Sequence, residues 1–187
     1  MRFGKLDLFL YYYAFSIMHE FAHVIVSLLL GIAIKEIVFL PVGVNAKYIG
    51  VNSAIKELII SLAGPIASLL FAIILKDKTF SYMNICIAIF NLIPIYPMDG
   101  GRIIKALITM VLSFFYENEK AKIKAQKVCN GITKICLIIV MGISLLSVFY
   151  YQNYYMFILT LYIVYISKEE IEKERIFEIF NYLQKDE

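Results

Sequence analysis

The sequence predicts an all-α polytopic membrane protein with about five transmembrane helices, and its composition and apolar runs lead to this fold class. Apolar residues make up 61% of the chain, charged residues only 18%, and the mean hydropathy is +0.77. Soluble globular proteins contain about 45–50% apolar and about 25% charged residues. Several uncharged runs approach the roughly 20 residues that a helix needs to cross a bilayer. A bilayer must therefore solvate part of this chain.

Three apolar runs supply the first expected helices. Residues 8–34 are interrupted only by two histidines and a glutamate, and residues 58–75 and 79–98 contain no charged residue. Each of these three runs is long enough for one span.

A fourth uncharged run, residues 135–167, is too long for one comfortable span. The polar pair Gln152-Asn153 inside it predicts a tight hairpin of two helices, the second of them short. Residues 103–116 contain Lys105 and are shorter than a span, so an interfacial helix is expected there.

Residues 35–52 favour strands over a helix. Ile, Val and Phe are frequent in this stretch, while Pro41, Gly43 and Gly50 would break a helix. Exposed strand edges are not tolerated in hydrocarbon. A short β-hairpin at the membrane surface, directly after the first helix, is therefore expected.

Residues 168–187 alternate charged residues with apolar ones at helical spacing, which predicts a soluble amphipathic helix. The expected organisation is a membrane-embedded domain, residues 1–167, and a helical tail, residues 168–187.

Lysine and arginine counts predict the orientation, because loops rich in these residues stay cytoplasmic. Five spans place 14 of them on the side of the C-terminus and four on the other side. An integral, multi-pass protein with a cytoplasmic C-terminus and an N-terminus on the opposite face is expected. If residues 103–116 also crossed, the counts would be 13 and five with the N-terminus inside, so both topologies stay open. The net charge of +3 is small and scattered, which argues against a nucleic-acid partner and fits a lipid bilayer.

The chain contains two histidines, and both lie in the sequence His19-Glu20-Phe21-Ala22-His23. On a helix, residues four apart lie about 40° apart around the axis and about 6 Å along it. Both imidazoles can therefore bind one Zn²⁺ ion, and the Glu20 carboxylate can take a proton from a metal-bound water. The alternative is a set of hydrogen-bonded side chains in a helix interface. Ionisable groups inside a membrane helix favour the functional interpretation.

A catalytic zinc usually has three protein ligands and one open position. The chain has no third histidine, and Asp99 is the best candidate for the remaining ligand. Pro94, Pro97 and two glycines around it predict a broken helix, and unwound backbone at membrane depth is tolerated where it lines a cavity. The alternative is that Asp99 only caps the next helix.

Asn91 lies two to three helical turns before Asp99 and is a candidate catalytic residue. Its amide could donate a hydrogen bond to a developing oxyanion, or could bind backbone groups that Pro94 frees. Both interpretations stay open. Ala63-Gly64-Pro65 is most simply an element that allows close helix packing.

Together these motifs resemble the site-2 protease family of intramembrane zinc metalloproteases. The resemblance rests on the His19–His23 segment, on Ala63-Gly64-Pro65, and on Asn91-x-x-Pro94-x-x-Pro97-x-Asp99-Gly100, in this order. Residues 39–43 and 91–101 are similar to the sporulation branch of that family. The resemblance implies that His19, His23 and Asp99 bind one Zn²⁺ per chain and that Glu20 activates water.

The resemblance also implies a membrane-tethered protein substrate, such as the pro-form of a sporulation sigma factor, and inhibitory membrane proteins as partners. The location would then be a bacterial cell or forespore membrane. Two other functions stay open: a general peptidase of membrane fragments, and a non-enzymatic membrane zinc-binding protein. A zinc carrier would not need Glu20, and it would favour further ligands along a pathway.

Overall fold

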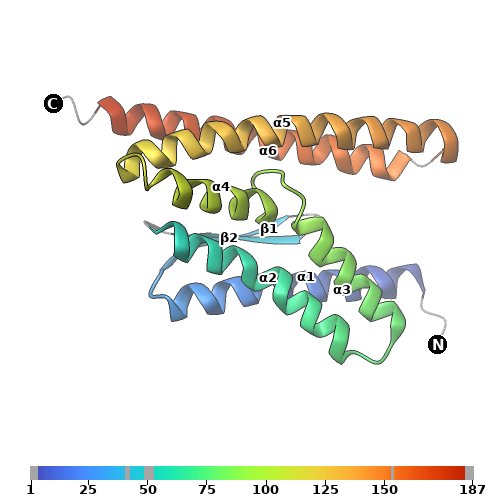
Figure 1. Cartoon of the computed structure of the whole chain (residues 1–187). Coiled ribbons are helices and arrows are strands. Elements are labelled where there is room, and N and C mark those ends of the chain that lie inside the picture. The colour runs from blue at the N-terminus through green and yellow to red at the C-terminus, as the bar shows by residue number, and fades with distance from the viewer. Residues whose placement is uncertain (1–3, 41–42, 49–52, 153, 184–187) are drawn as a thin grey trace. The chain divides into compact units, whose positions relative to one another are not determined.

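The computed structural model describes residues 4–40, 43–48, 53–152 and 154–183. The chain forms two compact units, Met1–Ile93 and Pro94–Glu187. Within the described residues there are six helices and one two-stranded sheet, so the fold is mostly helical, as the sequence predicts (Figure 1).

The first unit contains three helices that pack in sequence: α1 (Lys5–Leu29), α2 (Ala54–Ile74) and α3 (Lys78–Asn91). Helix α2 packs against both of the others. The apolar run of residues 8–34 extends beyond the end of α1 at Leu29. Gly31 adopts a φ of 70°, a left-handed conformation that glycine tolerates and that commonly ends helices. The first helix is therefore shorter than its apolar run.

Two strands follow α1, in the stretch where the sequence predicts them. β1 (Ile34–Leu40) and β2 (Gly43–Tyr48) pair antiparallel, with a register shift between Ile34 and Glu36. β2 also packs near α1. The expected helix breakers Pro41 and Gly50 lie outside the described residues, and the position of this sheet at the membrane surface stays a prediction.

The run of residues 79–98 does not form one helix. The Asp77 side chain caps α3 by accepting a hydrogen bond from the Thr79 backbone N–H at 2.8 Å, and α3 ends at Asn91 after 14 residues. Pro94 and Pro97 cannot donate backbone hydrogen bonds, so the helix stops before them. The broken backbone predicted from these prolines is present. A helix of 14 residues is also shorter than the roughly 20 residues of a span.

The second unit contains three helices: α4 (Asp99–Leu112), α5 (Asn118–Tyr151) and α6 (Tyr154–Leu183). Helix α4 covers most of the expected interfacial helix but starts at Asp99, four residues earlier. Helix α5 packs against both α4 and α6.

The turn between α5 and α6 lies where the polar pair predicts it. Gln152 is left-handed, with a φ of 51°, and ends α5. However, α6 is not a short helix followed by a separate tail helix, because its 30 residues run without interruption past Lys168. The expected boundary between residues 167 and 168 therefore falls inside one helix, and the division into two domains stays a prediction.

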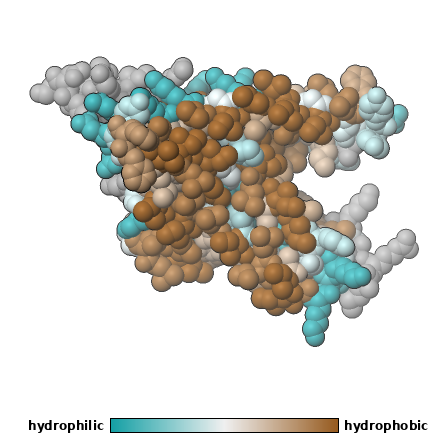
Figure 2. Space-filling view, viewed as in Figure 1, coloured by the Kyte–Doolittle hydropathy of each residue, from teal (hydrophilic) through white to brown (hydrophobic). Residues whose placement is uncertain are grey.

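Three helices of the described chain are long and apolar enough to cross a membrane: Leu6–Leu29, Ala54–Ile74 and Asn118–Tyr151. Large apolar side chains are exposed on all three, and Leu29, Ile73 and Phe149 are each 80% exposed. Figure 2 shows apolar side chains over much of the face in view. Such extensive apolar exposure is untypical of a soluble monomer and indicates an integral membrane protein. The total of five spans stays a prediction.

Candidate metal centre

Helix α1 presents His19 and His23 on one buried face of the first unit. The exposed fractions of the two side chains are only 4% and 1%. Their Nε2 atoms lie 3.3 Å apart, so both rings aim the same nitrogen at one place. The four-residue spacing brings the imidazoles together as the sequence predicts.

Helix α2 holds the other nitrogen of each ring. His19 Nδ1 lies 2.9 Å from Ser68 Oγ, and His23 Nδ1 lies 2.6 Å from the Ile60 carbonyl oxygen. A carbonyl only accepts hydrogen bonds, so His23 Nδ1 carries the proton and Nε2 keeps its lone pair. The Ser68 hydroxyl can accept from His19 Nδ1 in the same way. Such partners behind a ring fix the tautomer that binds metals.

The separation of the two Nε2 atoms tests whether zinc fits these residues. Zinc–nitrogen bonds are about 2.0–2.1 Å long, and two ligands of a tetrahedral ion then lie about 3.3 Å apart. His19 Nε2 and His23 Nε2 have this separation. Two lone pairs held so close repel one another unless a cation or a proton lies between them. The pair therefore has both the donor atoms and the spacing that zinc requires.

Gly64 of α2 leaves the space in front of these nitrogens. A Cβ atom at this position would lie 2.5 Å from His19 Nε2 and closer still to His23 Nε2. Any larger residue would therefore occupy the place to which both rings point. The sequence suggests close helix packing at Ala63-Gly64-Pro65, and the structure shows that the atoms packed against Gly64 are the imidazole rings.

Glu20 follows His19 directly on α1 and is partly exposed, in contrast to both histidines. One residue along a helix is a rotation of about 100°, so its carboxylate starts from the edge of the histidine face. This position is compatible with a carboxylate that contacts a bound water and not the metal.

Asp99 is the first residue of α4 in the second unit, where it is buried. The loop before it is held in place by Tyr96, whose backbone N–H donates to Thr133 Oγ1 of α5 at 3.0 Å. A Cβ on Gly101 would lie only 2.6 Å from the Tyr96 nitrogen. The start of α4 is therefore tightly packed. The residue in the capping position of α4 is Met98, not Asp99, and the part of Asp99 in a metal site stays a prediction.

Asn91 is the last residue of α3, and its Nδ2 donates to the Ile87 carbonyl of the same helix at 2.9 Å. Neither of the two roles considered for this amide is visible in that bond. A catalytic role for Asn91 stays a prediction.

Sequence reasoning missed Ser68 and the Ile60 carbonyl. Ser61, Gly64 and Ser68 recur at helical spacing and are buried, and this stripe of small residues could have indicated Ser68. No side-chain pattern could indicate a main-chain carbonyl as the partner of His23.

The comparisons with known proteins agree with the geometry. Residues 78–144 match peptidase family M50. The site-2 protease from Methanocaldococcus jannaschii has a similar structure, with a TM-score of 0.67 and 28% sequence identity over 88% of this chain and 77% of that protein. In sequence and in fold, this chain is therefore similar to site-2 proteases.

Curated proteins that are similar to this chain have related names. A zinc metalloprotease of Methanocaldococcus jannaschii is 28% identical over 91% of this chain and 52% of its own length. Stage IV sporulation protein FB of Bacillus subtilis is 27% identical over 71% of this chain and 48% of its own length. A putative zinc metalloprotease of Synechocystis is 28% identical over 53% of this chain. The chain therefore spans only about half the length of the Methanocaldococcus jannaschii and Bacillus subtilis relatives.

Proposed function

We propose that this chain is an intramembrane zinc metalloprotease that hydrolyses a peptide bond of a membrane-tethered protein. The observation that carries the proposal is the pair of Nε2 atoms, 3.3 Å apart, with each Nδ1 held from behind. The family assignment and the zinc metalloproteases among the relatives support it.

One Zn²⁺ would be held by His19, His23 and Asp99. When bound, zinc lowers the pKa of a coordinated water toward about 7 and polarises the carbonyl of the substrate. The protein holds the two histidines in the required tautomer through Ser68 and Ile60. These contacts leave the lone pair on Nε2 of each ring, the atom that would bind the metal.

Glu20 would act as the general base of the reaction. Its carboxylate accepts a proton from the attacking water and then passes that proton to the nitrogen of the leaving amine, so that the peptide C–N bond breaks without a net change in protonation. Asn91 would stabilise the developing oxyanion with its amide.

A narrower proposal concerns the substrate. The similarity to stage IV sporulation protein FB supports the pro-form of a sporulation sigma factor as the substrate, with inhibitory membrane proteins as partners. A general peptidase of membrane fragments is the competing enzyme function, and cleavage of a single defined bond in a candidate pro-protein would separate the two.

Glu20→Gln tests the mechanism. The amide has nearly the shape of the carboxylate but cannot accept the proton, so zinc content should stay normal while cleavage falls by about 10²–10⁴-fold. The measurement is a cleavage assay with a tethered substrate, run beside metal analysis of the same preparation.

The matched control is Glu172→Gln, which makes the same chemical change at an exposed position of α6. Cleavage by Glu20→Gln at close to the wild-type rate would rule out Glu20 as the base. A protein that binds zinc but cleaves no candidate substrate even as wild type would instead favour a non-enzymatic zinc-binding function.

A further inference from the structure

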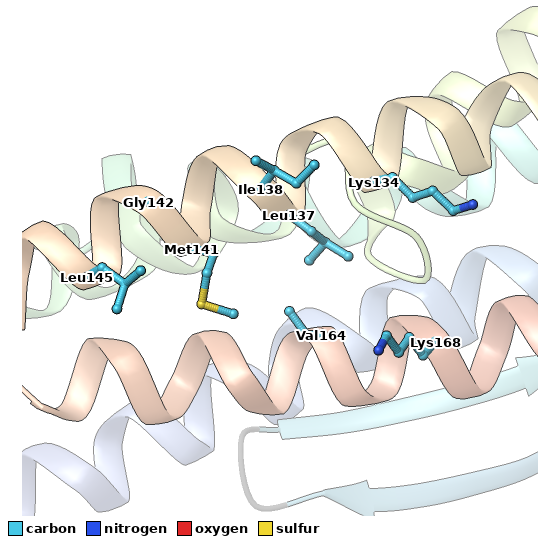
Figure 3. Close-up of a pocket in the computed structure, with 8 residues that line it drawn as sticks. All are labelled: Lys134, Leu137, Ile138, Met141, Gly142, Leu145, Val164 and Lys168. Atoms are coloured by element: carbon cyan, nitrogen blue, oxygen red, sulfur yellow. The ribbon is translucent and has the colours of Figure 1, made fainter.

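The second unit contains an apolar groove between α5 and α6, which the proposed proteolysis does not use. Its volume is about 650 Å³. One wall is the stripe of α5 from Lys134 to Leu145, and α6 contributes Val164 and Lys168 (Figure 3).

Two lysines lie at the same end of this groove. Figure 3 shows Lys134 on α5 and Lys168 on α6 at that end, with only apolar residues and a glycine lining the rest of the groove. Neither lysine has an ion pair in the described part of the chain. By contrast, Lys120 and Lys122 of α5 each pair with a glutamate. The groove therefore ends in two uncompensated positive charges.

The groove is also long and open enough for a hydrocarbon chain. The α5 wall from Lys134 to Leu145 extends for about 16 Å, at a rise of 1.5 Å per residue. Gly142 enlarges it, because a Cβ at this position would meet no atom within 4 Å. An elongated apolar ligand with a negative charge at one end matches these features.

We propose that the groove binds an anionic phospholipid, with an acyl chain along the α5 wall and the phosphate headgroup at Lys134 and Lys168. Charge complementarity favours an anionic lipid, because a zwitterionic lipid offers the same tails but no net charge to the two lysines. Basic pockets between membrane helices recognise anionic headgroups in this way. The lipid would bridge α5 and α6 near the point where α6 becomes charged.

The experiment uses the purified full chain in detergent micelles that contain equal amounts of phosphatidylglycerol and phosphatidylcholine with identical acyl chains. Native mass spectrometry measures the lipid that the protein retains. The wild type should retain phosphatidylglycerol selectively. Lys134→Gln or Lys168→Gln should each lower its affinity by about 5-fold, and the double variant by about 30-fold.

The matched control is the double variant Lys120→Gln, Lys127→Gln, which removes the same charge from α5 outside the groove. It should retain phosphatidylglycerol as the wild type does. Gly142→Leu should lose the lipid although both lysines remain, because a Cβ there meets no atom within 4 Å and the rest of the side chain would occupy the groove. Glycerol 3-phosphate, a headgroup without tails, should not bind.

Three results would overturn the proposal. The first is equal retention of the two lipids by the wild type, and the second is a loss in the control as large as in the groove variants. The third is a dimer that Gly142→Leu abolishes, since a second copy of the chain would then occupy the groove. Circular dichroism of each variant ensures that lost binding is not lost folding. If Gly142→Leu fails this check, the lysine variants still decide the question.

Discussion

Among the described residues of α2, Ser68 is the only one whose side chain forms a hydrogen bond with either imidazole. Its Oγ lies 2.9 Å from His19 Nδ1. Ser61 lies two turns earlier on the same helix, is equally buried, and has no partner for its Oγ among the described residues. The two serines therefore form a natural comparison between a hydroxyl that positions a ring and one that does not.

Ser68→Ala should weaken zinc binding or activity by about 10–100-fold, the usual cost of losing a partner behind a ligand histidine. Zinc release into a chelator measures the affinity, and the melting temperature of the same sample reports the fold. Ser61→Ala is the control and should change neither, because it removes a buried hydroxyl that has no partner to lose. Equal zinc affinity in the wild type and Ser68→Ala would show that Ser68 does not position His19.

Gly64→Ala is expected to expel zinc. Alanine in a helix interior is more stable than glycine by about 0.5–1 kcal/mol, so propensity alone would make this variant more stable. Its Cβ, however, would lie 2.5 Å from His19 Nε2. Metal analysis should show little zinc, whereas Gly131→Ala, where a Cβ meets nothing within 4 Å, should keep it. Full zinc occupancy in Gly64→Ala would show that the helices are farther apart.

Individual site residues were predictable to different degrees. The spacing of His19 and His23 predicts their approach, because the helix itself sets it. Ser68 was missed because its contact depends on how α2 is rotated against α1, which no pattern within one helix encodes.

Helix ends were predictable where local chemistry decides them. Prolines predict the break after α3, and a polar pair predicts the turn at Gln152. The length of α6 was not predictable in the same way, because the change from apolar to charged residues at Lys168 alters the solvent of the helix and not its backbone bonds. Residue composition therefore reports environment better than helix continuity.

The break between α3 and α4 gives Asp99 a testable role. If Asp99 only favoured the start of α4, Asp99→Asn would cost about 0.3–1 kcal/mol of helix-dipole interaction and leave proteolysis nearly normal. As the proposed third ligand, its loss should remove most of the zinc and the cleavage. Both are measured on the same preparation.

Asp77→Asn is the control for this variant, because Asp77 caps α3 through its side chain and asparagine caps equally well. That variant should cleave normally. Normal cleavage by Asp99→Asn as well would assign Asp99 to the helix alone.

At the scale of the whole chain, composition was enough to predict a membrane protein, but charge counting left the number of spans open. Three helices satisfy length and composition, and α3 is too short. The counts of 14 and four basic residues change only to 13 and five when one segment is reassigned. The two topologies, which place the N-terminus on opposite faces, therefore differ by only one basic residue on each side.

Cysteine labelling measures the orientation directly. After Cys86, Cys129 and Cys136 are replaced by serine, Glu172→Cys should react with a membrane-impermeant maleimide only from the cytoplasmic face, and Gly4→Cys only from the opposite face. Both positions are exposed in the structure. Labelling of both from one side would show an even number of spans and contradict the five-span topology.

The hydrogen-bond partners of the two imidazoles differ in how a mutation affects them. His19 depends on one hydroxyl, which a single nucleotide change can remove. The partner of His23 is instead the main-chain carbonyl of Ile60. Any amino acid at this position supplies that carbonyl, as long as α2 stays helical. A point mutation can therefore remove the hydrogen-bond partner of His19, whereas the partner of His23 is present whenever α2 forms.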